Sequence, residues 1–248
     1  MRKLVKTAAF AAAAMLVIQA SAGTWHENFE GGLDDWEAFT DPQGADDPTQ
    51  AVWEKRREMG NGIVTGEVHG PTLISTLRLR PPNVDTNQWT NYTVQARARM
   101  DSRIQDGELA VFGFSLYDHW DAVTHQSCLV RVQQGLSEVR FYTPNDFGVY
   151  RWLRAFEDRV WYDISATVET DAETGKDRIT FQIDDDDPLI VDWPASIGSG
   201  GVGLMIGRGV FSFDEVLIEG ESIPTGGKGP LSVSSTGKTA QVWANLKR

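Results

Sequence analysis

The sequence is poor in cysteine, in positive charge and in long apolar runs. Cys128 is the single cysteine among 248 residues, so no disulfide can form within the chain. Lys and Arg number 23 against 35 Asp and Glu, a formal net charge of −12, and no basic stripe is present. Because phosphate backbones attract clustered positive charge, nucleic acid is excluded as a partner. Beyond the first 22 residues, no apolar run approaches the roughly 18 residues that a membrane span requires.

Residues 1–22 have the composition of a signal peptide. Three basic side chains precede an apolar, alanine-rich run over 7–18, and residues 20–22 read Ala-Ser-Ala. This order of a basic region, an apolar region and a small-x-small site is typical of secretory signals. We therefore expect cleavage before Gly23 and an exported protein, found in the periplasm, at the cell surface or outside the cell. An uncleaved N-terminal anchor is the alternative.

The remaining chain divides into a body and a tail. Residues 23–223 hold 16 basic and 35 acidic side chains, a formal charge of −19. Such a body tolerates a hard cation and disfavours anionic partners. Residues 224–230 are rich in Gly and Pro and read as a linker. The short polar tail that follows, with Trp243, would fray, dock on the body, or bind a surface-anchoring partner.

Apolar residues of the body recur with a period of two, and no capped helical run of twelve residues occurs. Residues 91–100 alternate strictly between apolar and polar side chains, and 179–183 do the same, as half-buried strands do. Further strands are expected at 51–57, 62–68, 72–79, 108–117, 128–134, 137–143, 201–207 and 211–219. About ten short strands separated by Gly, Pro and Asn turns predict an all-β fold, a single two-sheet antiparallel β-sandwich over residues 24–222.

Both ends of the body carry motifs of a known superfamily. Residues 29–36 read Phe-Glu-Gly-Gly-Leu-Asp-Asp-Trp, residues 181–189 form a hairpin motif, and 211–218 read Phe-Ser-Phe-Asp-Glu-Val-Leu-Ile. This order resembles the concanavalin A-like lectin/glucanase superfamily, especially laminin-G-like modules and the bacterial family 16-like domains of 3-keto-glycoside hydrolases. Jelly-roll carbohydrate-binding modules open on a similar pattern. The resemblance implies a concanavalin A-like jelly roll that presents a concave face or rim loops to sugars.

The carboxylate pattern of the glucanases in that superfamily is missing. Hydrolysis of a glycoside requires two carboxyl groups about 5 to 9.5 Å apart, which those enzymes carry on one strand as Glu-x-Asp-x-x-Glu. The nearest run here is 214–219, in which we expect Asp214 and Glu215 to face opposite sides of a strand. Glucanase activity is therefore disfavoured. An enzyme acting on keto-sugars or oxidised glycosides, with Asp118, His119 or Asp146 as acid or base, stays open.

Two stretches combine aromatic with hydrogen-bonding side chains, the composition that sugar recognition requires. We expect both to be carbohydrate-binding loops. The predicted ligand-binding residues are Tyr117, Asp118, His119, Trp120, Tyr142, Asn145, Asp146, Tyr150, Arg151 and Trp152. For the first loop, the alternatives are a polar loop tip or a transition-metal site at its two histidines. For the second, the alternative is that Phe147 and Trp152 plug the edge of the sandwich.

The resemblance also implies a structural calcium ion that ties the opening segment to the last strand. Glu30 and Asp214 occupy the matching positions, and carboxylates are ligands that Ca²⁺ prefers. The four acids at 184–187 are a rival site, although such a run on a hairpin tip is usually a solvated turn. In a further alternative, Glu30 and Asp214 only cap turns through backbone N–H groups.

These observations favour an exported carbohydrate-binding or adhesion module without catalysis of its own. Its expected partner is a polysaccharide or glycoconjugate. The keto-sugar hydrolase is the competing class. A structural surface or assembly module, anchored by its tail, is the third.

Overall fold

The computed structural model describes residues 22–40, 51–69, 74–103, 110–119, 126–133, 136–143, 146–152, 155–193 and 197–229. Within these ranges the regular structure is β, apart from one turn of 3-10 helix, η2 (Thr86–Gln88). No helix in the described ranges is long and apolar enough to cross a membrane. Residues 1–21, which make up most of the predicted signal peptide, and residues 230–248 of the tail fall outside them.

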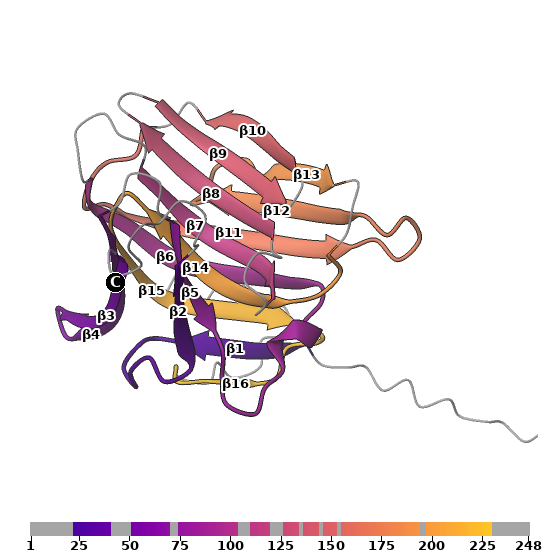
Figure 1. Ribbon diagram of the computed structural model, residues 1–248, viewed down its shortest axis with the longest axis horizontal. Coiled ribbons are helices and arrows are strands. Elements are labelled where there is room, and N and C mark those ends of the chain that lie inside the picture. Colours follow the sequence, from indigo (N-terminus) through magenta and orange to yellow (C-terminus); the bar gives the residue numbers. More distant parts are fainter. Residues whose placement is uncertain are drawn as a thin grey trace, which may run out of the picture.

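The strands form two sheets stacked face to face (Figure 1). Sheet A has the order β13 (Leu189–Trp193), β12 (Asp177–Ile183), β11 (Trp161–Thr170), β6 (Tyr92–Arg103), β15 (Gly209–Gly220), β1 (Gly23–Glu27) and β16 (Gly226–Gly227), with β4 (Asn61–Val68) and β3 (Ala51–Glu58) joined through β15. Sheet B has the order β10 (Asp146–Trp152), β9 (Leu136–Thr143), β8 (Gln126–Gln133), β7 (Ala110–Asp118), β14 (Gly201–Gly207), β5 (Ile74–Leu79) and β2 (Trp36–Thr40). Neighbouring strands are antiparallel except for the short pair of β1 with β16. The predicted two-sheet antiparallel β-sandwich is confirmed.

The core fills the space between the sheets with alternate side chains of each strand. On β6 the alternation runs as predicted, with Tyr92, Val94 and Ala96 buried and the residues between them partly exposed. Phe112 of sheet B packs against Phe211 of sheet A with ring centroids 5.5 Å apart. Each such aromatic ring contributes about 1.5–3 kcal/mol through burial, so the sheets hold together without a disulfide.

One predicted loop is a strand. Residues 146–152 form β10, which pairs with β9 from Asp146 opposite Thr143 to Trp152 opposite Ser137. Its sequence has no strict alternation, and Gly148 lies in its middle. Backbone pairing along the whole of β9 therefore decides this strand, and the predicted second loop becomes the outer strand of a hairpin.

The predicted linker is partly built into sheet A. Gly226 and Gly227 pair in parallel with Trp25 and His26, and Lys228 Nζ lies 3.4 Å from an Asp35 carboxylate oxygen. A Cβ at Gly226 would lie 2.6 Å from the Trp25 ring, so only glycine lets the backbone approach so closely. The body of the protein therefore continues to residue 229, beyond the predicted boundary at 223.

Candidate functional site

The outer face of sheet B, the face turned away from the core, carries a row of aligned positions. Leu77, Phe114 and Leu204 point into the core, so their neighbours on each strand take the outer face. Cross-strand partners link one position on every strand of the sheet (Figure 1). In order from β2 to β10, the row is Glu37, Arg78, Gly203, Ser115, Ser127, Tyr142 and Phe147. Six strand intervals of about 4.8 Å give it a length of about 29 Å.

The centre of the row is made of small residues. Gly203 lies between Arg78 on β5 and Ser115 on β7. A Cβ at Gly203 would collide with the Thr76 methyl group and lie 3.3 Å from Ser115 Cβ. The neighbouring outward positions of β14 and β7, Gly201 and Gly113, are also glycines. The middle of the face is therefore low, because larger side chains there would collide with their neighbours.

A buried ion pair stands beside this low centre. Arg78 Nε lies 2.8 Å from Asp118 Oδ1, and the Ser115 hydroxyl donates to Asp118 Oδ2. The Arg78 guanidinium also lies over the Phe39 ring, 3.8 Å from its centroid. Arg78 is 7% exposed and Asp118 only 2%. Charged side chains this buried are rare unless they are paired, so strands β2, β5 and β7 are locked to one another here.

A bulge in β7 turns Asp118 toward Arg78. The register of β7 with β14 shifts after Leu116, and Tyr117 has a φ of +49°. The extra residue lets Leu116 and Tyr117 both face the core, so the next side chain points outward. Tyr117 is fully buried, edge-on to Tyr92 with centroids 5.6 Å apart, and burial raises the pKa of its hydroxyl. The bulge therefore places Tyr117, one of the predicted ligand-binding residues, in the core.

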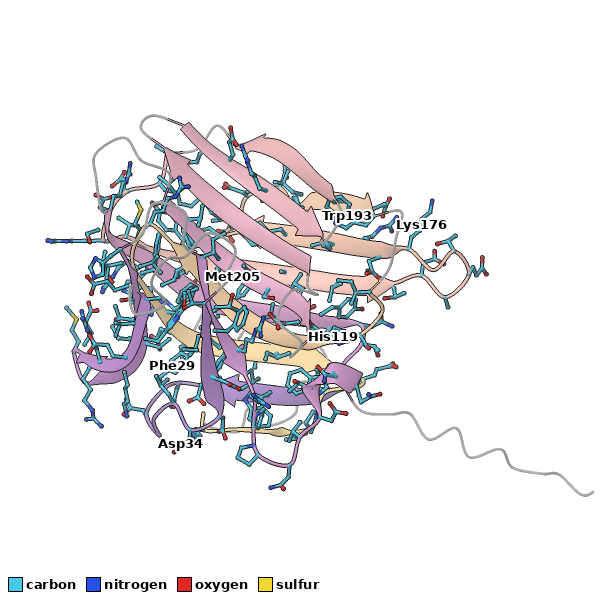
Figure 2. All side chains as sticks on the ribbon, viewed as in Figure 1. Phe29, Asp34, His119, Lys176, Trp193 and Met205 are labelled. Carbon is cyan, nitrogen blue, oxygen red and sulfur yellow. The ribbon has the colours of Figure 1, made fainter. Side chains whose placement is uncertain are left out.

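The other predicted residues divide between the two ends of sheet B. His119, just beyond β7, lies with Nε2 2.7 Å from the Ser199 carbonyl oxygen (Figure 2). The register of β7, β8 and β9 brings this end of β7 to the end where β10 begins at Asp146. Trp152 ends β10 about 20 Å away, opposite Ser137, whose side chain is buried. Trp120 and Asn145 lie outside the described residues.

The backbone of β9 and β10 carries the remaining predicted positions. Tyr142 lies in the row itself, whereas Tyr150 and Arg151 follow further along β10. Arg151 pairs with Glu138, and Tyr150 pairs with Val139, which is buried. The row therefore includes the positions of Tyr142 and Ser115. Tyr150 lies outside the row, because its cross-strand partner Val139 belongs to the core.

Sequence reasoning missed Arg78, Ser115 and Phe39. Arg78 stands between two leucines in an otherwise buried strand, which is a detectable signal for a charged side chain on a covered face. Ser115 and Phe39 give no such signal. Their role depends on the register of β7 and β2 with strands far away in the sequence.

Asp214 and Glu215 lie on the same side of sheet A, contrary to expectation. The register of β15 with β6 shifts between Asp214 and Leu217, and Glu215 has a φ of +51°. Because of this second bulge, both carboxylates face outward and Val216 faces the core. Glu215 Oε2 lies 2.7 Å from His26 Nε2, and Asp214 Oδ2 lies 3.7 Å from Arg97 Nη1.

Asp214 is held in an unfavourable environment for its charge. Burial, followed by the neighbouring Glu215 carboxylate, raises the pKa of Asp214 to about 6, although Arg97 opposes the shift. Glu30 also contributes to raising this pKa, so the fold brings the two predicted calcium ligands into electrostatic range of each other.

Both predicted calcium ligands accept backbone N–H groups. Glu30 Oε1 accepts the Gly62 N–H at 2.6 Å, and Asp214 Oδ1 accepts the Glu215 N–H at 2.9 Å. Glu30 Oε2 also lies 3.1 Å from Arg57 Nη2. Across the described part of the chain, no group of three or more His, Cys, Asp or Glu side chains is arranged to hold a metal.

The outward positions of β7 carry no carboxylate ahead of the bulge. They are Val111, Gly113 and Ser115. Asp118, the carboxylate beyond the bulge, is bound by Arg78 and Ser115. The described outward positions of β7 therefore supply no free carboxyl group of the kind that glycoside hydrolysis requires.

Comparison with known proteins gives a fold. No family profile and no curated protein sequence matches the chain. A protein of unknown function from Shewanella oneidensis MR-1 aligns with a TM-score of 0.50 and 10% identity, over 81% of this chain and 87% of that chain. A sialidase aligns with a TM-score of 0.51 and 10% identity, over 79% of this chain and 18% of its own. A carbohydrate-binding module from Bacillus subtilis aligns with a TM-score of 0.49 and 16% identity, over 75% of this chain and 95% of that chain. Likenesses at 10% identity support the β-sandwich fold alone.

The buried ion pair makes a prediction about stability. Asp118→Ala leaves the Arg78 guanidinium buried without its partner and should lower the free energy of unfolding by about 3–5 kcal/mol. The double variant Arg78→Met, Asp118→Leu removes both charges and should stay within about 1 kcal/mol of the wild type. Urea denaturation measures both. Asp192→Ala, which breaks the exposed pair with Arg178, is the control and should cause no measurable change. An equal loss in the single and double variants would contradict a buried pair.

Asp214 makes a prediction about pH. Its folded pKa of about 6 lies above its ordinary value of 3.8, so the folded protein keeps a proton that the unfolded chain has already lost. Ionisation of Asp214 therefore costs up to about 3 kcal/mol of stability as the pH rises from about 4 to 6, and the loss is complete above that window. Asp214→Asn, measured by urea denaturation in EDTA, should be more stable than the wild type at pH 7.5 and no more stable at pH 4. If the free energies of unfolding of the two proteins changed equally with pH, Asp214 would not have the raised pKa described above.

Proposed function

We propose that this protein is an exported carbohydrate-binding module that holds a glycan along the outer face of sheet B. The row that joins Arg78, Gly203 and Ser115 to the positions of Tyr142 and Phe147 carries this proposal. Sugar rings stack their C–H faces on aromatic side chains and give their hydroxyl groups to polar ones. A row about 29 Å long with small residues at its centre suits an extended chain of several sugar units.

The ion pair determines which half of the row the glycan uses. Arg78 and Asp118 are buried. We therefore propose that they hold Ser115 and the end of β7 in place and do not contact the glycan. Ser115 is itself buried, so the glycan lies over β8, β9 and β10, between the positions of Ser127 and Phe147. Asp146, Asn145, His119 and Trp120 belong to the same end of the sheet or directly follow it in sequence, which supports their assignment as partners for sugar hydroxyl groups.

We infer that binding occurs without catalysis. Val111, Gly113 and Ser115 on β7 offer no acid or base, and Asp118 is neutralised by Arg78. The competing activity is hydrolysis of a keto-sugar or oxidised glycoside with His119 or Asp146 as acid or base. Turnover of a 3-keto-glycoside by the purified protein would replace the binding function with that activity.

Glycan binding is tested first on an array and then by calorimetry with the best ligand. Tyr142→Ala and Phe147→Ala remove the aromatic positions of the row and should each weaken binding at least about tenfold, about 1.4 kcal/mol. Val149→Ala, on the same strand but in the next row, is the matched control and should retain affinity. If no glycan binds and retention at the cell surface depends on residues 230–248, the structural module is the better assignment.

We also propose a structural calcium ion between Glu30 and Asp214. Their electrostatic proximity and the negative charge of the body support it, since an ion would relieve the repulsion between these carboxylates. Binding that favours the folded state stabilises it by about 2.7 kcal/mol at a hundredfold excess over Kd.

A melting experiment in calcium and in EDTA tests this ion. Calcium should raise the melting temperature of the wild type by roughly 5–10 °C, and Asp214→Ala should abolish the rise. Neutralising Asp185 and Asp186 at the β12–β13 turn should leave the rise intact. Equal melting curves in calcium and EDTA would instead leave Glu30 and Asp214 as turn caps.

A further inference from the structure

Three arginines from separate segments lie near the end of β6. Arg103 is the last residue of that strand and pairs with Gly209, so the neighbouring Arg208 is close to it on the β15 side. On the β11 side, the Arg159 N–H donates to the Met100 carbonyl at 2.7 Å. The turn that carries Arg159 also brings an Asp158 carboxylate oxygen 3.3 Å from Arg103 Nη2. Arg103 therefore lies between the turns that carry the other two.

These arginines have few partners, unlike the other arginines whose side chains the structure describes in the two sheets. Arg78, Arg97 and Arg99 each lie within 4.0 Å of at least one carboxylate. In the part of the chain that the structure describes, the side chains of Arg159 and Arg208 make no ion pair or hydrogen bond. The Nε of Arg103 is buried and has no acceptor. Its contact with Asp158 leaves this cluster with an excess of two positive charges.

The backbone at both turns projects the two unpaired side chains. Arg159 has a φ of +63° and Arg208 a φ of +56°, a left-handed conformation that is uncommon for residues other than glycine. Such strain persists where the surrounding structure imposes it and often marks a functional position. Arg159 is exposed and Arg208 partly so, which leaves both guanidinium groups open to a ligand.

The negative charge of the body does not prevent an anion from binding here. At physiological ionic strength the Debye length is about 8 Å, so the charges of distant acidic residues are largely screened. Within the neighbourhood, Asp101 is held by Arg99 and Ser212, and Asp158 by Arg103. Glu157, which is exposed beside the turn, and Glu67, which pairs with Val210 near Arg208, are local charges that oppose an anion.

We propose that Arg103, Arg159 and Arg208 form an oxyanion site that takes a sulfate or carboxylate group of an acidic polysaccharide. Guanidinium groups bind such planar or tetrahedral oxyanions through paired N–H donors. The site is separate from the row on sheet B and does not depend on it. This site recognises the charged groups attached to the polysaccharide, whereas we propose that the row recognises its sugar rings.

The test compares unmodified dextran with its sulfated form and with polygalacturonate, a carboxylated polymer of a different sugar. Binding of dextran sulfate, unmodified dextran and polygalacturonate is measured by calorimetry at 50 and 150 mM NaCl. The wild type should bind dextran sulfate, polygalacturonate or both, more weakly at higher salt, and should ignore unmodified dextran at this site. A preference for dextran sulfate over unmodified dextran shows that the sulfate groups, and not the shared sugar chain, are recognised.

A charge-matched pair of variants isolates the site. Arg159→Glu with Arg208→Glu should weaken binding of the acidic polymer at least tenfold. Lys176→Glu with Arg178→Glu makes the same change of charge beyond the other end of β6, at the β11–β12 hairpin (Figure 2), and should weaken it less than twofold. Arg159→Lys with Arg208→Lys keeps the charge but loses the paired donors, and should fall between them.

Four results would overturn the proposal. They are no binding of either acidic polymer, equal losses in the two charge-reversal pairs, competition by inorganic sulfate as strong as by the polymer, or loss of acidic-polymer binding in Phe147→Ala. The last result would place the acidic polymer on sheet B, whereas failure of the array experiment with retained dextran sulfate binding would reject only the sheet B function. Because the Arg159 and Arg208 side chains have no partners in the described part of the chain, the variants at these two positions should keep the wild-type melting temperature.

Discussion

Each strand of this sandwich can turn only alternate side chains toward the other sheet, and the burial of those side chains holds the molecule together. Two of the three register shifts in the described strands, at Tyr117 on β7 and at Glu215 on β15, matter most here; the third lies between Val210 and Phe211. In each, one extra residue changes the face on which the following side chains lie. The first bulge brings Asp118 to Arg78, and the second sets Asp214 beside Glu215. The polar groups with the strongest interactions thus owe their positions to two local departures from regular pairing.

The pair of Arg78 with Asp118 is the most costly of these arrangements. Removing two charges from water carries a desolvation penalty that their attraction does not always offset. A pair of apolar residues at these positions would give the folded protein about the same stability. The charged pair instead fixes the relative positions of β5 and β7, and with them the low centre of the row at Gly203 and Ser115. It is therefore better explained by the precision of that face than by stability.

The arginines of this acidic protein fall into two groups, those paired with carboxylates and those without such a partner. Arg97 and Arg99 lie among carboxylates on sheet A and stack near the Trp161 ring, with guanidinium carbons 5.0 and 4.5 Å from its centroid. These arginines neutralise a polar sheet face. Among the arginines that the structure describes, Arg159 and Arg208 lack such carboxylates. A body of formal charge −19 can accordingly present a small cationic surface at one corner.

The sequence by itself determined the fold class, because the period of two is a local property of each strand. Residues 91–100 alternate in the sequence and alternate in β6. It also marked the end of β7 and the β9–β10 segment as places where aromatic and polar side chains concentrate. It did not determine the orientation of Tyr117, the strand nature of 146–152, or the common side of Asp214 and Glu215.

Those features were decided by tertiary structure, since each depends on partners distant in sequence. A bulge exists only relative to the strand opposite it, and β14 follows β7 by more than 80 residues. Likewise, Arg78 and Ser115 become neighbours only because both strands pair with Gly203. The side-chain pattern within one strand shows which residues face the core and which face outward. The register between strands decides which of those residues become neighbours.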